Sequence, residues 1–106
     1  MALALPEATE RPAWGQPAFR VRDKIFVALS KDETSMGFKV PKEERAELIA
    51  AEPEKFYFIE GHDNTYNWAR VRLDTVDTDE LAELITEAWR RTAPKRLVQD
   101  YDAANG

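Results

Sequence analysis

Residues 66–73 read Tyr-Asn-Trp-Ala-Arg-Val-Arg-Leu, and the apolar side chains at 69, 71 and 73 alternate with an aromatic or basic side chain at 68, 70 and 72. Successive side chains of an extended strand point to opposite faces, so Trp68, Arg70 and Arg72 share one face. The other face is apolar and suits a core, whereas an indole beside two guanidinium groups is unusual for a surface that meets only water. The pattern therefore predicts a strand with a hydrophobic inner face and an aromatic-basic outer face.

Other hydrophobic runs predict four more strands, separated by turn-forming residues. These runs are residues 17–22, 25–29, 35–40 and 55–60. The odd-numbered positions 25, 27 and 29 of the second run share an apolar face, as do the even-numbered positions 36, 38 and 40 of the third. The last run is apolar on both faces and is therefore predicted to be a central strand. Residues 6–16 contain two prolines and a glycine and are predicted to form a loop.

Helical spacing and breaking residues predict three helices. Residues 1–5 fit the last turn of a helix that ends at Pro6, and Pro41 suits the first turn of a second helix that runs to about Glu52. Leu81, Leu84, Ile85, Ala88 and Trp89 recur at helical spacing in the third, for which Asp77 and Glu80 form a capping box. Pro94 interrupts this helix. Residues 95–101 are expected to add one turn, and residues 102–106 to fray.

The element order predicts one α+β domain over residues 1–106, a two-layer fold of order α-β-β-β-α-β-β-α. Short connections make its five strands mainly antiparallel. Each helix has one apolar stripe, so all the helices can pack on the same face of the sheet. The opposite face would then remain open to water or to a partner.

Composition narrows the possible functions. The chain of 106 residues has a formal net charge of −5, which opposes non-specific binding to polyanionic DNA, although basic residues cluster locally. It has no cysteine, which excludes disulfides, thiolate zinc sites and a cysteine nucleophile. The apolar residues 1–5 lack the basic region and length of a leader, and no stretch is long enough to span a membrane. We therefore expect a cytoplasmic protein that does not enter membranes.

The predicted open face supplies the main candidate site. Guanidinium groups can neutralise phosphates, and an aromatic ring can stack on an unpaired base. The candidate nucleic-acid-binding residues are Arg20, Arg22, Lys39, Trp68, Arg70 and Arg72. The alternative is an ordinary solvated face, in which arginine stems cover Trp68 and a cross-strand carboxylate such as Glu60 pairs with an arginine.

A second basic cluster consists of Arg90, Arg91, Lys95 and Arg96. These side chains could hold phosphate, but cations also stabilise the carboxyl end of a helix. The acidic segment at residues 74–87 would repel DNA if it shared that face.

The sequence shows no pattern of catalytic or metal-binding residues. His62 is the only histidine, and with Glu60 and Asp63 it does not make a convergent transition-metal site; it is expected to serve as a turn residue. The carboxylates of residues 74–87 lack the spacing of a calcium loop, and the glycines do not form a phosphate-binding loop. We therefore expect no enzyme, cofactor or metal site, and expect Trp14 and Trp89 to lie in the core.

Three stretches taken in order resemble the MmcQ/YjbR-like family. They are Trp14-Gly-Gln-Pro-Ala-Phe-Arg-Val-Arg-Asp-Lys-Ile-Phe26, the spacing from His62-Asp-Asn64 to Trp68, and Ala88-Trp-Arg-Arg-Thr-Ala-Pro-Lys-Arg-Leu97. The resemblance runs from about Leu3 to Tyr101 and implies a single antiparallel sheet with helices on one face. The family is described as DNA-binding through a double-wing arrangement, and most of its members are functionally uncharacterised. The related fold also occurs in secretion chaperones, and family members usually carry a longer first helix.

Three hypotheses for the function follow. The first is DNA binding by the open face, which the resemblance implies. The second is a protein-interaction module, including a homodimer, that buries Trp68 against a partner. The third is a small-ligand pocket around Trp14, Tyr57 and His62.

Overall fold

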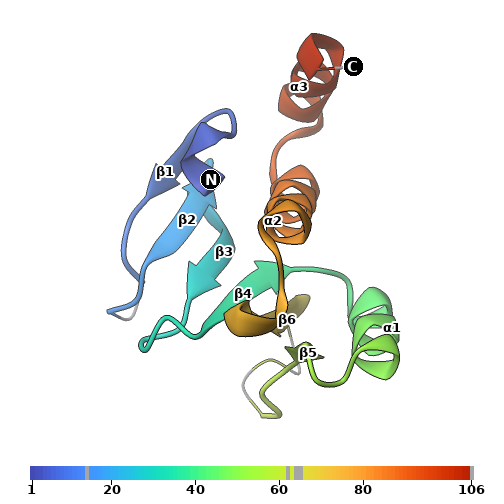
Figure 1. The fold of residues 1–106 in the computed structure, drawn as a ribbon. Helices are drawn as coiled ribbons and strands as arrows, with labels where there is room; N and C mark the ends of the chain where they lie inside the picture. Colours follow the sequence, from blue (N-terminus) through green and yellow to red (C-terminus); the bar gives the residue numbers. More distant parts are fainter. Residues whose placement is uncertain (14, 62, 64–65, 106) are drawn as a thin grey trace.

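The computed structural model of the chain describes residues 1–13, 15–61, 63 and 66–105. Its elements in chain order are the 3-10 turn η1 (Ala2–Ala4), β1 (Ala8–Glu10), β2 (Ala18–Val21), β3 (Lys24–Leu29), β4 (Ser35–Lys39), α1 (Lys42–Ala51), β5 (Phe56–Tyr57), β6 (Trp68–Arg72), the 3-10 turn η2 (Leu73–Thr75), α2 (Thr78–Thr92) and α3 (Lys95–Asn105). The strands form one sheet in the order β1-β2-β3-β4-β6-β5, and every neighbouring pair is antiparallel. This is the predicted α+β architecture (Figure 1).

The hydrophobic core lies between the sheet and the helices. α2 packs against β3 and β4, while α1 contacts β5 and β6 (Figure 1). The sheet contributes Val27, Phe38, Val71 and other buried residues, and α2 contributes Ile85, Ala88 and Trp89. Trp89 is fully buried, as predicted, and its indole Nε1 donates a hydrogen bond of 3.0 Å to the carbonyl of Pro6.

The prediction of five strands is wrong, because the described part of the chain forms a six-stranded sheet. β1 lies in the segment that was expected to be a loop, and it pairs with β2 at the sheet edge. Of its three residues only Thr9 favours a strand, while Ala8 and Glu10 do not, and the segment stands between Pro6 and Pro12. Proline is tolerated beside an edge strand, so the signal that suggested a loop does not exclude one there.

The run at 55–60 was wrongly predicted to be a central strand. Only Phe56 and Tyr57 pair with β6, and β5 is the last strand of the sheet. Phe56 enters the core, the ring of Phe58 lies 4.2 Å from the guanidinium carbon of Arg45, and Ile59 is 44% exposed. The hydrophobicity of the run therefore reflects a cation–π contact and a surface residue rather than a strand buried on both faces.

An irregularity in the β2–β3 register changes which residues face the core. Phe19 lies opposite Val27, but the next residue, Arg20, lies opposite Ile25. Phe26 is the extra residue, and a bulge of this kind disturbs strict alternation. Phe26 and Val27 are both buried while Ile25 is only half-buried, so the predicted apolar face of 25, 27 and 29 holds for Val27 but not for Ile25.

Local signals at the helix ends were read correctly, except at the carboxyl end of the chain. The Asp77 side chain accepts a hydrogen bond of 2.8 Å from the backbone NH of Glu80, which confirms the Asp77 half of the capping box predicted for α2. The Glu80 carboxylate instead accepts a hydrogen bond of 2.8 Å from Nζ of Lys55. Residues 102–105 were expected to fray, but they continue α3, where Asp102 pairs with Arg90. The first helix is one 3-10 turn, as expected.

Candidate nucleic-acid interface

β6 has the predicted alternation. Ala69 and Val71 have no exposed surface, while Trp68, Arg70 and Arg72 are half-buried and project from the other side of the strand. The helices cover the side that holds Ala69 and Val71. The aromatic-basic stripe therefore lies on the side of the sheet away from the core.

Strand pairing determines which residues join this stripe. Paired residues point to the same side of a sheet, and the register places Lys39 beside Trp68, Tyr57 beside Arg70, and Ser35 beside Arg72. Arg20 lies on the same side of β2, because its neighbours Phe19 and Val21 face the core. We call the surface formed by Arg20, Lys39, Tyr57, Trp68, Arg70 and Arg72 the open face. Ala18 on the same side of β2 is fully buried, so the accessible part of the open face lies mainly over β4, β6 and β5.

The indole of Trp68 lies flat against Gly37 of the neighbouring strand. A Cβ added at Gly37 would be 2.6 Å from the indole Cε2, closer than real Cβ atoms approach such an atom. Glycine is therefore required at this position by the ring above it. The contact fixes the indole over β4 and leaves Trp68 half-buried rather than submerged in the core.

We expect Gly37→Ala to destabilise the protein by about 1–3 kcal/mol, because the new methyl group overpacks the indole contact. Chemical denaturation of Gly37→Ala, Trp68→Ala and the double variant measures the effect as a double-mutant cycle. In the Trp68→Ala background the alanine at 37 should cost much less, because the ring is gone. An equal cost in both backgrounds would show that the indole does not restrict position 37.

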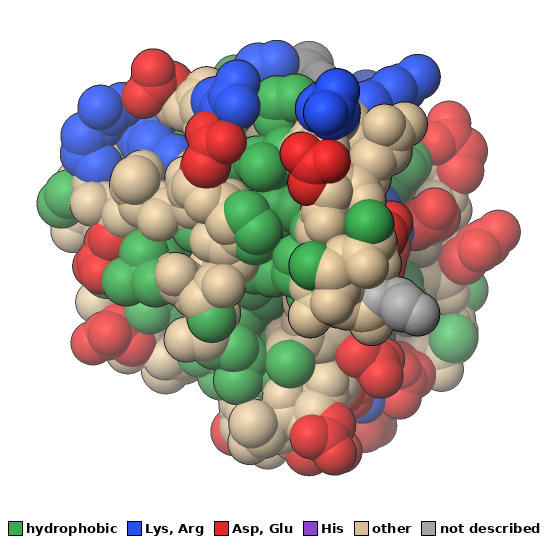
Figure 2. Space-filling view, turned by 90° about the horizontal axis from the view of Figure 1, so that it is seen from above, with side chains coloured by type: hydrophobic (Ala, Val, Ile, Leu, Met, Phe, Trp, Pro, Cys, Tyr) green, Lys and Arg blue, Asp and Glu red, His purple; other side chains and the backbone are tan. Residues whose placement is uncertain are grey.

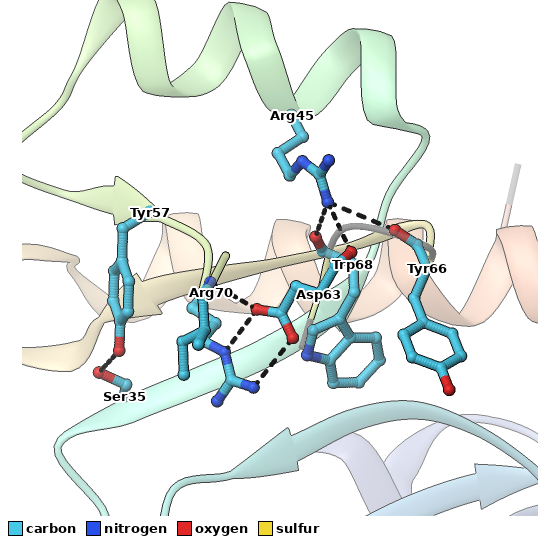
Figure 3. Close-up of polar contacts among 8 residues, drawn as sticks. Ser35, Arg45, Tyr57, Asp63, Tyr66, Trp68 and Arg70 are labelled. Carbon is cyan, nitrogen blue, oxygen red and sulfur yellow. Dashed lines mark hydrogen bonds and ion pairs between the residues drawn. The ribbon is translucent and has the colours of Figure 1, made fainter. Parts of the chain in front are cut away.

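Arg70 points along the open face but is engaged by Asp63 (Figure 3). Its Nε and Nη2 lie 2.9 and 3.1 Å from the two carboxylate oxygens, and Asp63 also accepts a hydrogen bond of 2.8 Å from the backbone NH of Ile59. The Asp63 side chain is 1% exposed and that of Arg70 16%. The hydrogen bonds that Arg70 donates to the Asp63 carboxylate raise the pKa of Arg70, although burial opposes the shift. Arg70 is therefore mainly a structural residue. The carboxylate that pairs with an arginine of this face is that of Asp63, and not that of Glu60 as the sequence suggested.

Arg45 of α1 holds the same segment from the helical side of the sheet (Figure 3). Its Nη1 lies 3.1, 3.3 and 3.0 Å from the backbone carbonyl oxygens of Asp63, Tyr66 and Trp68. Arg45 is the buried residue of α1, at 9% exposure. The backbone at both ends of the turn that leads into β6 is thus anchored by one guanidinium.

Arg72 is placed differently from Arg70. Its guanidinium carbon lies 4.3 Å from the centre of the Tyr57 ring, and its Nη1 donates a hydrogen bond of 3.1 Å to the carbonyl of Glu54. The Tyr57 hydroxyl is 2.7 Å from the Ser35 hydroxyl at the edge of a broad surface hollow. Among the described residues the arginine of the open face that stacks on a ring is Arg72, on Tyr57, and none stacks on Trp68, where the alternative hypothesis expected one.

The remaining cations differ in whether a carboxylate neutralises them. Arg22 lies outside the open face, in the two-residue turn between β2 and β3. It pairs with Glu7, and its hydrogen bond lowers the pKa of the Glu7 carboxyl. Within the described ranges, no carboxylate lies within ion-pair distance of Arg20, Lys39 or Arg72. The Nε of Arg20 is buried and has no hydrogen-bond partner in that part of the chain. The uncompensated charge of the open face thus comes from these three side chains.

The second basic cluster is not a continuous cationic site. Arg90 pairs with Asp102, Arg91 with Glu44, and Arg96 with Asp100. Arg90 and Arg91 lie in the last turn of α2, where the helix dipole favours them, but Lys95 and Arg96 begin α3. A view onto the end of the molecule that carries α3 shows lysine and arginine side chains interspersed with carboxylates (Figure 2).

The other sequence predictions have separate outcomes. Trp14 and His62 lie outside the described residues, so the ligand pocket proposed around them and Tyr57 stays a prediction. The described residues contain no group of three or more histidines, aspartates or glutamates suited to a metal ion. Among the helices formed by residues the structure describes, none is long and apolar enough to cross a bilayer.

Three contributors to the site were missed from the sequence. Arg45 stands three and four residues before Leu48 and Ile49, on the same stripe of the helix. A charged residue on this apolar stripe was the sequence signal that could have indicated its buried role. Asp63 stood in a run of turn-forming residues that does not reveal which one becomes buried. Tyr66, 62% exposed, stands two residues before Trp68 in the same alternating stretch, in the bend that precedes β6.

The fold and the open face define a small α+β protein whose sheet has one covered and one partly accessible surface. A family model described as YjbR matches residues 3–91, and the chain belongs to this family. Uncharacterized proteins of Mycobacterium bovis and Mycobacterium tuberculosis are 48% identical to it over 59 residues, a match that covers 56% of this chain and 45% of theirs. The chain thus spans about half the length of these curated relatives.

The fold has a counterpart among solved structures. A crystal structure of a Deinococcus radiodurans protein with a domain of the DUF419 class superposes with a TM-score of 0.68 and 24% sequence identity. The match covers 83% of this chain and 70% of that one. It supports the assignment of the fold.

Proposed function

We propose that this chain is a non-enzymatic DNA-binding domain that uses its open face. The observation that carries the proposal is the uncompensated positive charge of Arg20, Lys39 and Arg72 on the same side of the sheet as the indole of Trp68, with Lys39 directly beside it. Cations of this kind position phosphates, and an aromatic ring beside them offers a surface to a base. Arg70 and Arg22 do not belong to the contact set, because each is committed to a carboxylate.

The net charge of −5 restricts where DNA can bind. Like charges repel the phosphate backbone over most of the surface, so binding depends on the few cations of the open face. We therefore expect moderate affinity that weakens as salt rises. Each phosphate contact contributes about 0.7–0.9 to the slope of log affinity against log salt.

Fluorescence anisotropy of labelled DNA at increasing salt tests the proposal. Lys39→Glu combined with Arg72→Glu should weaken binding strongly and flatten the salt dependence, because two phosphate contacts become repulsive. The matched control is Lys42→Glu combined with Lys95→Glu, which makes the same charge change at exposed positions on α1 and α3. Absence of binding by the wild-type chain at low salt, or equal loss in both double variants, would refute the proposal.

A protein-interaction module is the second candidate function, and the acidic net charge favours it. Tyrosine, tryptophan and arginine are the residue types enriched at binding hot spots, and the open face contains all three. In this case the chain would bury Trp68 against itself or against another protein. Light scattering over a range of protein concentrations tests the homodimer. A homodimer requires that the measured molecular mass rise with concentration in the wild-type chain, and that it stay near the mass of a monomer in Trp68→Ala.

A further inference from the structure

We infer that the open face takes single-stranded nucleic acid, and that Trp68 and Tyr66 each stack on an unpaired base. The inference rests on the proposed function and narrows its ligand from DNA in general to an unpaired strand. Three observations support it: the placement of two aromatic rings, the anchoring of the backbone beneath them, and the small number of uncompensated cations.

The two rings project from the same side of the chain (Figure 3). Trp68 and Tyr66 point in the direction of the Arg70 guanidinium, while Arg45 approaches from the opposite side. One nitrogen of Arg45 contacts the carbonyl oxygens of both residues, so Tyr66 and Trp68 are neighbours in space and each ring can accept its own base. Tyr66 lies in the bend before β6 and is 62% exposed, so most of its ring surface is accessible to a base.

The backbone that carries both rings is fixed before any ligand arrives. Arg45 donates hydrogen bonds to the carbonyl oxygens of Tyr66 and Trp68, and Gly37 supports the indole from below. A platform whose backbone is already ordered loses less entropy on binding than a flexible loop does.

The charge of the open face suits an unpaired strand better than a duplex. Duplex-binding proteins commonly neutralise about 6–10 phosphates, whereas Arg20, Lys39 and Arg72 offer three uncompensated cations. Base stacking must then supply much of the affinity, and duplex bases are already stacked on one another. Exposed rings with few cations therefore discriminate in favour of unpaired bases.

A three-arm titration tests the inference with oligo(dT), oligo(U) and a mixed-sequence duplex, each about 12 nucleotides long, a length within the range that such surfaces cover. We expect both single strands to bind roughly tenfold or more tightly than the duplex at low salt. The salt slope for the single strands should not exceed about 2, which is the value for three phosphate contacts. A preference for oligo(dT) or oligo(U) would identify DNA or RNA as the source of the strand.

Variants of the two rings identify the stacking residues. Tyr66→Ala and Trp68→Leu should each weaken single-strand binding about fivefold or more, whereas Tyr66→Phe and Trp68→Phe, which keep a ring, should retain most of it. Thermal unfolding of each variant separates lost binding from lost folding. At unchanged stability, a loss of binding in the phenylalanine variants comparable to that in Tyr66→Ala and Trp68→Leu would overturn the stacking roles.

The titration separates failure of the inference from failure of the proposed function. A duplex that binds as tightly as the single strands, and depends on Lys39 and Arg72, would overturn the inference and leave DNA binding in place. Absence of binding in all three arms would overturn both.

Discussion

Asp63→Ala is expected to lower the free energy of unfolding by about 3–5 kcal/mol, the range for removing one partner of a buried ion pair. The Asp63 carboxylate is fully buried and accepts hydrogen bonds from two nitrogens of Arg70 and from the backbone NH of Ile59. Its removal leaves a guanidinium that is 16% exposed and a backbone donor without their acceptor. Partial access of Arg70 to water should place the loss near the lower end of the range.

Urea denaturation measures this loss, and two companion variants identify its cause. Asp63→Asn keeps the shape and removes the charge, so it should be milder than Asp63→Ala. Combining Asp63→Ala with Arg70→Met removes the unpaired guanidinium and should recover part of the stability. A loss below about 1 kcal/mol for Asp63→Ala would show that the pair contributes no more than an exposed one.

Arg45→Ala should have an effect of similar size, about 2–4 kcal/mol, because it removes the donor shared by three carbonyl oxygens in a partly buried region. The substitution also removes the stacking of the Arg45 guanidinium on Phe58, in which the guanidinium carbon lies 4.2 Å from the centre of the ring. Arg45→Lys retains a charge but not the planar group, so it should recover only part of the stability.

Arg45 and Asp63 hold one segment from opposite sides, so their losses should not add. Once one anchor is gone, the turn before β6 is already loosened and the second anchor has less to stabilise. The double variant is therefore expected to lose less than the sum of the single variants, which denaturation curves report as a coupling energy. Full additivity of the two stability losses would mean that the Arg45 contacts and the Asp63–Arg70 pair stabilise separate parts of the molecule.

These anchors also change how the open face should be probed. Arg70→Glu would place a second carboxylate beside Asp63 in a buried site and unfold the segment that carries Tyr66 and Trp68. Loss of DNA binding in such a variant would report on folding. Lys39 and Arg72 are better probes, because in the described part of the chain neither pairs with a carboxylate.

Features determined by local periodicity could be predicted from the sequence. The alternation of β6 and the Asp77 cap of α2 depend only on residues close together in the chain, and both were confirmed. β1 could not be recognised, because it has only one strand-favouring residue, Thr9, and is formed by its pairing with β2, which lies about ten residues further along the chain. The edge position of β5 likewise depends on its pairing with β6 alone, which the hydrophobicity of the run does not reveal.

The candidate site was only partly predictable for a related reason. Strand alternation placed Trp68 and Arg72 on the outer face, but it could not show that Arg70 is neutralised seven residues away by Asp63. It also could not show that Gly37 supports the indole, because this contact depends on the β4–β6 register. Charge compensation and packing across strands are tertiary properties, and they decide which members of the predicted set remain available to a ligand.

The most direct test of binding at the open face is the NMR signal of the Trp68 indole NH during a titration with single-stranded oligonucleotide. The chain has three tryptophans, and Trp68→Phe assigns the signal. Trp89 is an internal control, because its indole is fully buried and donates to Pro6. We predict that the Trp68 signal and the backbone amides of Lys39 and Arg72 shift together while the Trp89 signal stays in place. A Trp68 signal that does not move, or shifts confined to α3, would contradict the account.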